Sequence, residues 1–324
     1  MFNKLFWQLT FWRKIITVEE LNIKKLLAWM TLARVPFHIA GVFPFVLGNV
    51  LSWYITGRLN WIVFVWSILA VELILLAIHY TGEYFDYEVD SISAKIGVSK
   101  FSGGSQILQM RIISKKDTLI AVLICILMAG GVGILLQFYY KTGIFTITLG
   151  MIALFGGLFY SAKPIKWAYR GVGELWVGFC YGWLTLATSF YLQTGEIPSL
   201  IHWASLPIAL SIFNVVLINE FPDYIADREA GKRNLVVRFG MSNMSKLYAL
   251  ISFAMCISFT ISIKAGIPFK ALWFFSPLMI LSLITSMQVL KGKYAEKRKL
   301  ESICARTLIV NIGITASLLL AVLI

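Results

Sequence analysis

The sequence predicts an all-α fold, a polytopic membrane bundle of about nine transmembrane helices with its N-terminus on the cytoplasmic side. Three observations predict it. Of the 324 residues, 59% are hydrophobic and only 14% are charged, whereas a soluble domain carries about 25% charged residues. Apolar runs long enough to cross a hydrocarbon core of about 30 Å recur along the whole chain. The basic residues gather in the turns between those runs.

The elements follow from the runs in order. Residues 1–30 mix bases with Trp and Phe, which is typical of a helix lying in the membrane interface, and a partly ordered tail is the alternative. No long polar insertion separates the later runs, so we expect one domain over residues 1–324. The transmembrane helices are expected near residues 36–56, 61–82, 117–138, 143–160, 172–193, 200–219, 244–263, 270–290 and 304–324.

The distribution of Lys and Arg predicts the orientation of this bundle. With the N-terminus in the cytoplasm, 25 of the 29 basic residues fall on the cytoplasmic side. This asymmetry favours an odd number of helices with the C-terminus outside. It also accounts for the net charge of +13, so we expect the lipid bilayer as a partner and no nucleic acid. The basic residues left outside are Arg58, Lys141, Lys264 and Lys270.

Two short acidic stretches stand where long apolar runs end. Residues 83–90 read EYFDYEVD and residues 220–227 read EFPDYIAD. In each stretch, acids at i, i+3 and i+7 share one face of a helix, where they repel one another unless a cation binds. Carboxylates at the end of a membrane helix are costly and therefore candidates for function, and several hard oxygen ligands suit Mg²⁺. The expected metal ligands are Glu83, Asp86, Asp90, Glu220, Asp223 and Asp227.

The two stretches repeat at a constant offset of 137 residues, which pairs Glu83 with Glu220 and Lys95 with Lys232. The repeat indicates an internal duplication of a helical unit. Such a pseudo-repeat would place the two acidic stretches face to face, both on the cytoplasmic side.

Residues 82–90 and 219–234 resemble the two aspartate-rich motifs of the UbiA superfamily of intramembrane prenyltransferases, usually written N-D-x-x-D-x-x-x-D and D-x-x-x-D. The resemblance covers most of the chain. Gly82 and Glu83 stand where the family has asparagine and aspartate, so Gly82 is left out of the expected site. The resemblance implies an enzyme that uses Mg²⁺ to transfer an isoprenyl group from a polyprenyl diphosphate to a lipophilic or aromatic acceptor. It implies catalytic roles for Asp86 and Asp223.

The second motif and the glycine-containing loops look most similar to the branch of the family that prenylates 1,4-dihydroxy-2-naphthoate in menaquinone biosynthesis. The family also has a tyrosine followed four residues later by a lysine. Here Lys163 and Lys166 follow Tyr160 at three and six residues, so the resemblance implies catalytic Tyr160 with either lysine as its partner, Lys163 first. Topology alone would also place lysines in this loop.

Polar loops supply the candidates for diphosphate binding. Paired glycines within residues 100–106, KFSGGSQ, let backbone amides approach a phosphate, although a flexible turn explains them equally well. Bases near the acids would neutralise a diphosphate leaving group, and positive-inside topology is their alternative explanation. The expected diphosphate ligands are Arg34, Lys100, Ser102, Gly103, Lys166, Lys232 and Arg233.

His79 lies one turn before Glu83 on the same stripe and is a candidate for the acceptor pocket. Other functions fit part of the pattern. The missing asparagine suits a UbiA-type terpene cyclase or a non-aromatic acceptor, and a cation-coupled transporter of an anionic solute would also use duplicated helices. A lipid-binding scaffold would bind without turnover. The absence of a transit peptide favours a plasma (inner) membrane with the active site toward the cytoplasm.

Overall fold

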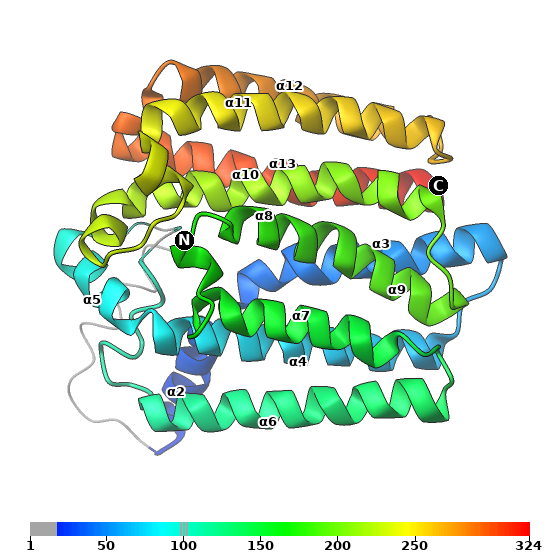
Figure 1. Ribbon diagram of the computed structural model, residues 1–324, viewed down its shortest axis with the longest axis horizontal. Helices are drawn as coiled ribbons and strands as arrows, with labels where there is room; N and C mark the ends of the chain where they lie inside the picture. The colour runs from blue at the N-terminus through cyan, green and yellow to red at the C-terminus, as the bar shows by residue number, and fades with distance from the viewer. Residues whose placement is uncertain (1–17, 98, 100, 102) are drawn as a thin grey trace.

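The structure is a computed structural model that describes residues 18–97, 99, 101 and 103–324. Its helices run side by side along one direction and form a bundle (Figure 1). In the described part of the chain, eight helical segments are long and apolar enough to span a membrane. A ninth, shorter apolar helix, Thr146–Ser161, lies among them. Each predicted apolar run falls on one of these segments, so the all-helical, multi-pass membrane fold is confirmed.

The helices follow one another through short connections. The π-helical segment η1 extends α6, and a second π-helical segment, η3, joins α8 to α9. Of the predicted interfacial segment 1–30, the structure describes only the part from Val18 onward, where α2 begins. The bounds are α2 Val18–Leu32, α3 Val35–Thr56, α4 Trp61–Phe85, α5 Tyr87–Ile96, α6 Lys115–Ile134, η1 Leu135–Tyr139, α7 Thr146–Ser161, η2 Trp167–Tyr169, α8 Gly173–Gly178, η3 Phe179–Leu184, α9 Thr185–Thr194, α10 Ser199–Glu229, α11 Leu235–Lys264, α12 Ala271–Leu290, η4 Lys293–Ala295 and α13 Lys297–Leu323.

Side-chain caps explain where several helices begin. The side chain of Asn60 accepts from backbone amides at the start of α4, and Ser114 does the same at the start of α6. Asn234 caps α11 by accepting from the amide of Val237. This last cap matters for the site, because it fixes the end of the loop that follows the second acidic stretch.

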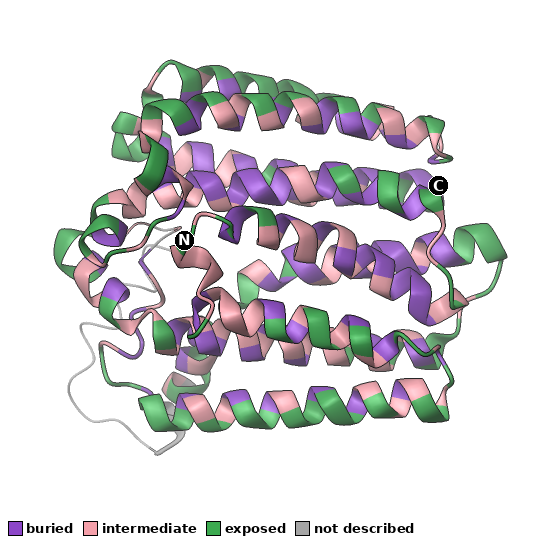
Figure 2. Cartoon of the chain, viewed as in Figure 1, coloured by how far each residue is buried: buried purple, intermediate pink, exposed green. Residues whose placement is uncertain are grey.

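α10 lies inside the bundle and carries the second acidic stretch. It packs against α11, α13, α8 and η3. In its most apolar stretch of 18 residues, 67% of the residues are buried, compared with 28% in the corresponding stretch of the peripheral helix α6. Figure 2 shows the same contrast, with buried residues concentrated along α10 and exposed ones along α6. The acids of the second stretch are therefore held on one of the best-buried helices in the fold.

The two acidic stretches differ in backbone, although their sequences repeat. α10 continues as one helix through residues 220–227, with Pro222 inside it. The first stretch is interrupted at Asp86, which ends α4 and precedes α5. The expectation of a continuous helical stripe therefore holds for the second stretch and is wrong for the first. There, Glu83 lies on α4 and Asp90 on α5.

Candidate active site

Acids from both stretches line one cavity of about 300 Å³, called here the acidic cavity. α10 supplies one side of it, and the junction of α4 with α5 supplies another. The remaining wall comes from α3, α7, α8 and η3, and from the loops that contain Gly103 and Lys232. Carboxylates gathered in this way repel one another unless cations bind between them. The acids that line it are Asp86, Asp90, Glu220, Asp223 and Asp227.

Asp86 is oriented by the end of α7 and the loop that follows it. Its Oδ2 accepts a hydrogen bond from Ser161 Oγ at 2.7 Å, and its Oδ1 accepts one from the Tyr169 hydroxyl at 2.8 Å. Burial and the nearby Asp86 charge raise the pKa of Tyr169. The hydroxyl therefore keeps its proton and remains a donor, which fixes the direction of the Asp86 carboxylate.

Lys232 brings a positive charge to the second stretch, on a side chain that is only 15% exposed. Its Nζ lies 3.1 Å from Asp227 Oδ1 and 5.3 Å from the ring centre of Tyr169. Burial lowers the pKa of Lys232, but Asp86 and Asp227 raise it by more, so its pKa lies well above the ordinary value. Asn234 donates to the other Asp227 oxygen at 2.8 Å. The ammonium group is therefore a permanent charge at the wall of the acidic cavity.

Glu83 is buried, but it does not line the acidic cavity. Its Oε1 accepts from Arg34 Nε at 2.7 Å and from the Ser105 amide at 3.0 Å, and its Oε2 accepts from Ser105 Oγ at 2.6 Å. These bonds join the residue before α3, the end of α4 and the glycine loop. Coordination of a metal by Glu83 would have to replace some of them, and its role as a ligand stays a prediction.

The paired glycines bring the backbone against two carboxylates. The Gly103 amide donates to Asp223 Oδ2 at 3.3 Å. Gly104 has a φ of +69°, and a Cβ there would lie 2.1 Å from Asp90 Oδ2, so this close approach requires glycine. Burial raises the pKa of Asp90 to about 8. A cation bound beside Asp90 would favour its charged form.

The oxygens at the cavity fit a hard divalent cation such as Mg²⁺. Asp90 Oδ2, Glu220 Oε2 and Asn219 Oδ1 are buried and have no hydrogen-bond partner. Glu220 also lies against the buried Glu174, and a cation bound between two such carboxyl groups would offset their repulsion. Within the described residues, no three His, Cys, Asp or Glu side chains are close enough to hold one ion. Oxygens of a bound diphosphate would have to complete the coordination.

Tyr160 and His79 also line the acidic cavity, as their predicted roles require. The His79 ring stacks on His38 with 5.1 Å between ring centres, and its buried Nε2 has no hydrogen-bond partner. His38 is in turn held by Glu72, whose Oε2 lies 2.7 Å from His38 Nδ1. A histidine nitrogen without a partner at a cavity wall is available to a bound hydroxyl group.

The other predicted bases lie outside this wall. Lys166 places its Nζ 4.1 Å from the ring centre of Tyr169. Lys163 and Arg233 are exposed and do not line the cavity. Of the other predicted diphosphate ligands, Arg34 and Gly103 line the acidic cavity with Lys232, whereas Lys100 and Ser102 fall outside the residues that the structure describes.

The structure adds residues that the sequence did not single out. They share one property: each contacts a predicted acid, from a loop or a helix end. The sequence shows that these residues lie in polar segments after the apolar runs. Only the fold shows which acid each of them contacts. These residues are Ser105, Ser161, Tyr169, Glu174 and Asn234.

Comparison with known proteins agrees with this geometry. Residues 38–304 match the UbiA prenyltransferase family. The chain is 26% identical over 259 residues to the 1,4-dihydroxy-2-naphthoate octaprenyltransferase of Bacillus subtilis, which is 78% of each chain. It is 34% identical over 118 residues to a UbiA prenyltransferase domain-containing protein 1 of Dictyostelium discoideum, which is only 36% of each chain.

Solved structures share the fold. A UbiA homolog from Archaeoglobus fulgidus bound to GPP and Mg²⁺ superposes with a TM-score of 0.67 at 16% identity, over 92% of this chain and 100% of that one. An apo UbiA homolog from Aeropyrum pernix superposes with a TM-score of 0.63 over 94% of this chain and 99% of that one. With the family match covering more than half of the sequence, the chain belongs to the UbiA prenyltransferase family and is a membrane-embedded prenyltransferase.

Proposed function

We propose that this enzyme transfers an isoprenyl group from a polyprenyl diphosphate to an aromatic acceptor, 1,4-dihydroxy-2-naphthoate, in a Mg²⁺-dependent reaction. Relatives that align over most of their length support the acceptor, since they are named for this naphthoate or for a related naphthoquinone. The solved UbiA homolog with GPP and Mg²⁺ supports the donor and the metal. The uneven distribution of Lys and Arg between the two sides of the bundle supports a plasma membrane enzyme whose site opens toward the cytoplasm.

One observation carries the proposal. The acids of both stretches, the partly buried ammonium group of Lys232 and the unpartnered Nε2 of His79 share a single cavity. A diphosphate needs cations around its oxygens, and an aromatic acceptor needs an apolar wall with a few polar groups. The acidic cavity supplies both, because Trp176 and Tyr181 also line it.

The side chains have distinct parts in the reaction. Asp86, Asp90, Glu220, Asp223 and Asp227 would hold magnesium, which when bound would neutralise the diphosphate. Lys232 and Arg34 bind phosphate oxygens directly, and the Gly103 amide is the expected backbone donor. The bond between the prenyl C1 and the diphosphate oxygen breaks, and its electron pair leaves with the diphosphate. The buried, largely apolar bundle keeps water from the allylic cation.

The acceptor then completes the transfer. A ring carbon of the naphthoate forms a bond to C1, and the ring loses one proton to a base or to the departing diphosphate. His79 binds an acceptor hydroxyl through Nε2, and Tyr160 positions the acceptor or the leaving group from the facing wall. Lys163 is kept as the predicted partner of Tyr160. Lys163 follows Tyr160 by three residues in the chain, and its side chain is exposed.

The test is an incubation of purified protein in detergent with Mg²⁺, geranylgeranyl diphosphate and a mixture of aromatic acceptors, read by mass spectrometry. We expect prenylated dihydroxynaphthoate and diphosphate in equal amounts, both lost with EDTA. Release of diphosphate with a free terpene alcohol or hydrocarbon would contradict the acceptor and favour a cyclase. No turnover by folded protein, with several donor lengths tried, would overturn the proposal and favour a transporter or a scaffold.

A further inference from the structure

An ionisable pair of side chains joins α3 to α4 within the membrane-spanning part of the bundle. Glu72 lies near the middle of α4, where a carboxylate is costly unless a partner compensates it. Its Oε2 lies 2.7 Å from Nδ1 of His38 on α3, and the His38 side chain is only 6% exposed. Neither residue lines the acidic cavity, so any effect of the pair on the reaction must pass through another residue.

The hydrogen bonds of His38 show how many protons the pair holds. Its Nε2 lies 2.9 Å from the carbonyl oxygen of Ala33, and because a carbonyl only accepts, Nε2 carries a proton. A second proton lies between Nδ1 and Glu72, on one atom or the other, because two acceptors do not form a hydrogen bond. Both nitrogens of His38 are therefore engaged, and its ring is fixed between Ala33 and Glu72.

The fixed ring of His38 supports His79 on α4. The two imidazoles stack with 5.1 Å between their centres and 12° between their planes. Stacking leaves the edge of the His79 ring free. His79 lines the acidic cavity, and its Nε2 is buried without a hydrogen-bond partner. Of these three side chains, His79 is therefore the one placed to meet a substrate.

The charges around His79 favour its neutral form, which is the form that a base needs before the reaction. Arg34 and Lys232 are positive, and the proton that His38 shares with Glu72 lies behind the ring. A further positive charge on His79 would be repelled by all of these, and cations bound to the acids would add to the repulsion. Besides the acids, the titratable side chains that line the acidic cavity with His79 are Arg34, Tyr160, Cys180, Tyr181 and Lys232.

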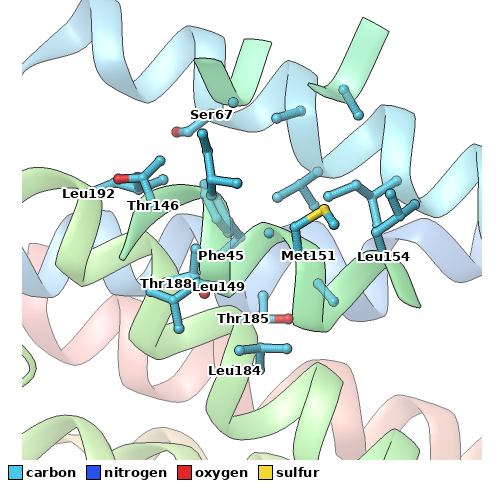
Figure 3. Close-up of a pocket in the computed structure, with 18 of the residues that line it drawn as sticks. Phe45, Ser67, Thr146, Leu149, Met151, Leu154, Leu184, Thr185, Thr188 and Leu192 are labelled. Carbon is cyan, nitrogen blue, oxygen red and sulfur yellow. The ribbon is translucent and has the colours of Figure 1, made fainter. Parts of the chain in front are cut away.

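The cavity is apolar on the inner side of His79. A second cavity of about 360 Å³ adjoins it, and Ile78, the neighbour of His79, lines both. Figure 3 shows Phe45, Leu149 and Leu154 among the side chains of this second cavity, and none of the described residues that line it is charged. Apolar cavities hold water poorly. A proton that leaves an acceptor beside His79 therefore needs a side chain to receive it.

We propose that His79 is the general base for the acceptor, and that Glu72 and His38 are the residues that position it. This inference rests on the proposed prenyl transfer and specifies its proton acceptor. Nε2 takes the proton of an acceptor hydroxyl, and the electron pair of that O–H bond passes through the oxygen into the ring. A ring carbon then forms the bond to C1 of the prenyl group, whose former bonding pair has left with the diphosphate. When that carbon loses its own proton to the diphosphate, the imidazolium returns its proton to the oxygen, and the neutral base is restored.

The first experiment compares His79→Gln with His202→Gln. His202 lies near the start of α10, where its Nδ1 accepts from Trp183 Nε1 at 2.7 Å, and it does not line the acidic cavity. Glutamine can still bind a hydroxyl, but it cannot take a proton. At about pH 7 we expect His79→Gln to lower the rate of prenylation by about 10²-fold or more, as for other lost general bases.

The pH profile separates a base from a binding group. Above about pH 7 the rate of His79→Gln should rise by about tenfold per pH unit, because the acceptor increasingly arrives already ionised. The unsubstituted protein and His202→Gln should change much less with pH. The affinity of every variant for a non-reacting donor analogue should stay within about threefold, since the diphosphate contacts are untouched.

The second experiment tests the positioning pair. Glu72→Ala leaves Nδ1 of His38 without a partner and releases its ring, so we expect kcat to fall by about tenfold or more. In Glu72→Gln the amide donates to Nδ1 while Nε2 stays bonded to Ala33, so this variant should restore most of the rate. Glu72→Ala should keep the pH profile of the unsubstituted protein, because its base is still present. Thermal unfolding in detergent shows whether each variant is folded.

The outcomes separate this inference from the proposed function. If the unsubstituted protein prenylates no acceptor, the proposed function fails and this inference fails with it. If that protein is active and His79→Gln matches His202→Gln at every pH, another group takes the proton and His79 is not the base. A rate of His79→Gln that stays low at every pH would also exclude a base and leave a binding role. Equally slow Glu72→Ala and Glu72→Gln would contradict the positioning by hydrogen bonds.

Discussion

Asp86 belongs to the first acidic stretch and Asp223 to the second, and both line the acidic cavity. Each is therefore expected to help hold the cations that neutralise the donor diphosphate. Removing either carboxylate removes a ligand that stabilises the developing charge. We predict that Asp86→Ala and Asp223→Ala each lower kcat by on the order of 10² or more. The measurement is the rate of product formation at saturating donor and acceptor.

The matched control for this charge removal is Glu196→Gln. Glu196 is exposed and lies between α9 and α10, and it does not line the acidic cavity. Its variant should keep the normal rate. A near-normal rate for either aspartate variant would remove that residue from the catalytic set.

Lys232 and Arg233 are neighbours in sequence, but only Lys232 is drawn into the cavity wall by Asp227. A largely enclosed cation beside the diphosphate should contribute far more than an exposed one. We predict that Lys232→Met lowers kcat/KM for the donor by about tenfold or more, whereas Arg233→Met changes it by less than about threefold. Donor titrations at fixed Mg²⁺ measure both.

Removing Lys232 also leaves Asp227 without its ion-pair partner, so thermal unfolding in detergent has to accompany the kinetics. A fall in activity that simply follows a loss of folded protein would not support the assigned role. Equal kinetic effects in the two variants would show that exposure does not decide which base binds phosphate.

The acids of the site could be predicted from the sequence because their spacing, their place at the ends of apolar runs and their repetition are all local patterns. Their partners could not. Tyr169 reaches Asp86 from 83 residues away, and Ser105 reaches Glu83 across 22 residues. Neither contact has a spacing rule, because both depend on how loops fold over the cavity. Glu83 is a similar case. Its carboxylate suggested a metal ligand, but Arg34 and Ser105 already donate hydrogen bonds to both of its oxygens.

At the scale of the helices, apolar length predicted the eight candidate membrane spans and the shorter apolar helix of the described residues, while polar interruptions were harder to interpret. The residues of the second stretch stay helical in α10, although Pro222 lies among them. The first stretch breaks at Asp86. The π-helical segment η3 was also not predicted, since its residues are as apolar as those of its neighbours. Break points of this kind depend on packing between helices, which hydropathy does not report.

Close packing at η3 gives a prediction about stability. A Cβ on Gly182 would lie 2.6 Å from the Cα and 2.7 Å from the amide nitrogen of Ala209 on α10, and backbone atoms cannot move aside as a flexible side chain can. We predict that Gly182→Ala destabilises the protein by about 1–3 kcal/mol, because it forces η3 away from α10. The melting temperature in detergent should fall accordingly.

Gly131→Ala is the control for this prediction. Gly131 lies on α6, and nothing lies within 4 Å of the Cβ that it would gain. Alanine is the better helix former, so this variant should have the same or a slightly higher melting temperature. Equal behaviour of the two variants would mean that η3 and α10 are not in tight contact.

For the whole molecule, the place of the acidic cavity and the distribution of Lys and Arg point to the same orientation in the membrane. α5, which holds Asp90 and follows Asp86, lies at one end of the bundle in Figure 1, and the connections α3–α4, α6–α7, α9–α10 and α11–α12 lie at the other. The four basic residues assigned to the outside, Arg58, Lys141, Lys264 and Lys270, belong to or border three of those connections, α3–α4, α6–α7 and α11–α12. A diphosphate bound at the acidic cavity would therefore lie at the end of the bundle opposite to those connections.

This arrangement predicts which connections an impermeant reagent reaches. Glu196 lies in the α9–α10 connection and Lys293 in the α12–α13 connection, and both are exposed. We predict that a charged maleimide added to intact cells labels Glu196→Cys, and that it labels Lys293→Cys only after the membrane is permeabilised. The reason is the excess of Lys and Arg on the side that holds Lys293 and the acidic cavity.

The native cysteines Cys125, Cys256 and Cys304 are buried and Cys180 lies within the bundle, so the unsubstituted protein measures their background. Labelling of Lys293→Cys in intact cells would invert the orientation and place the acidic cavity on the outer side, where a cytoplasmic donor could not reach it.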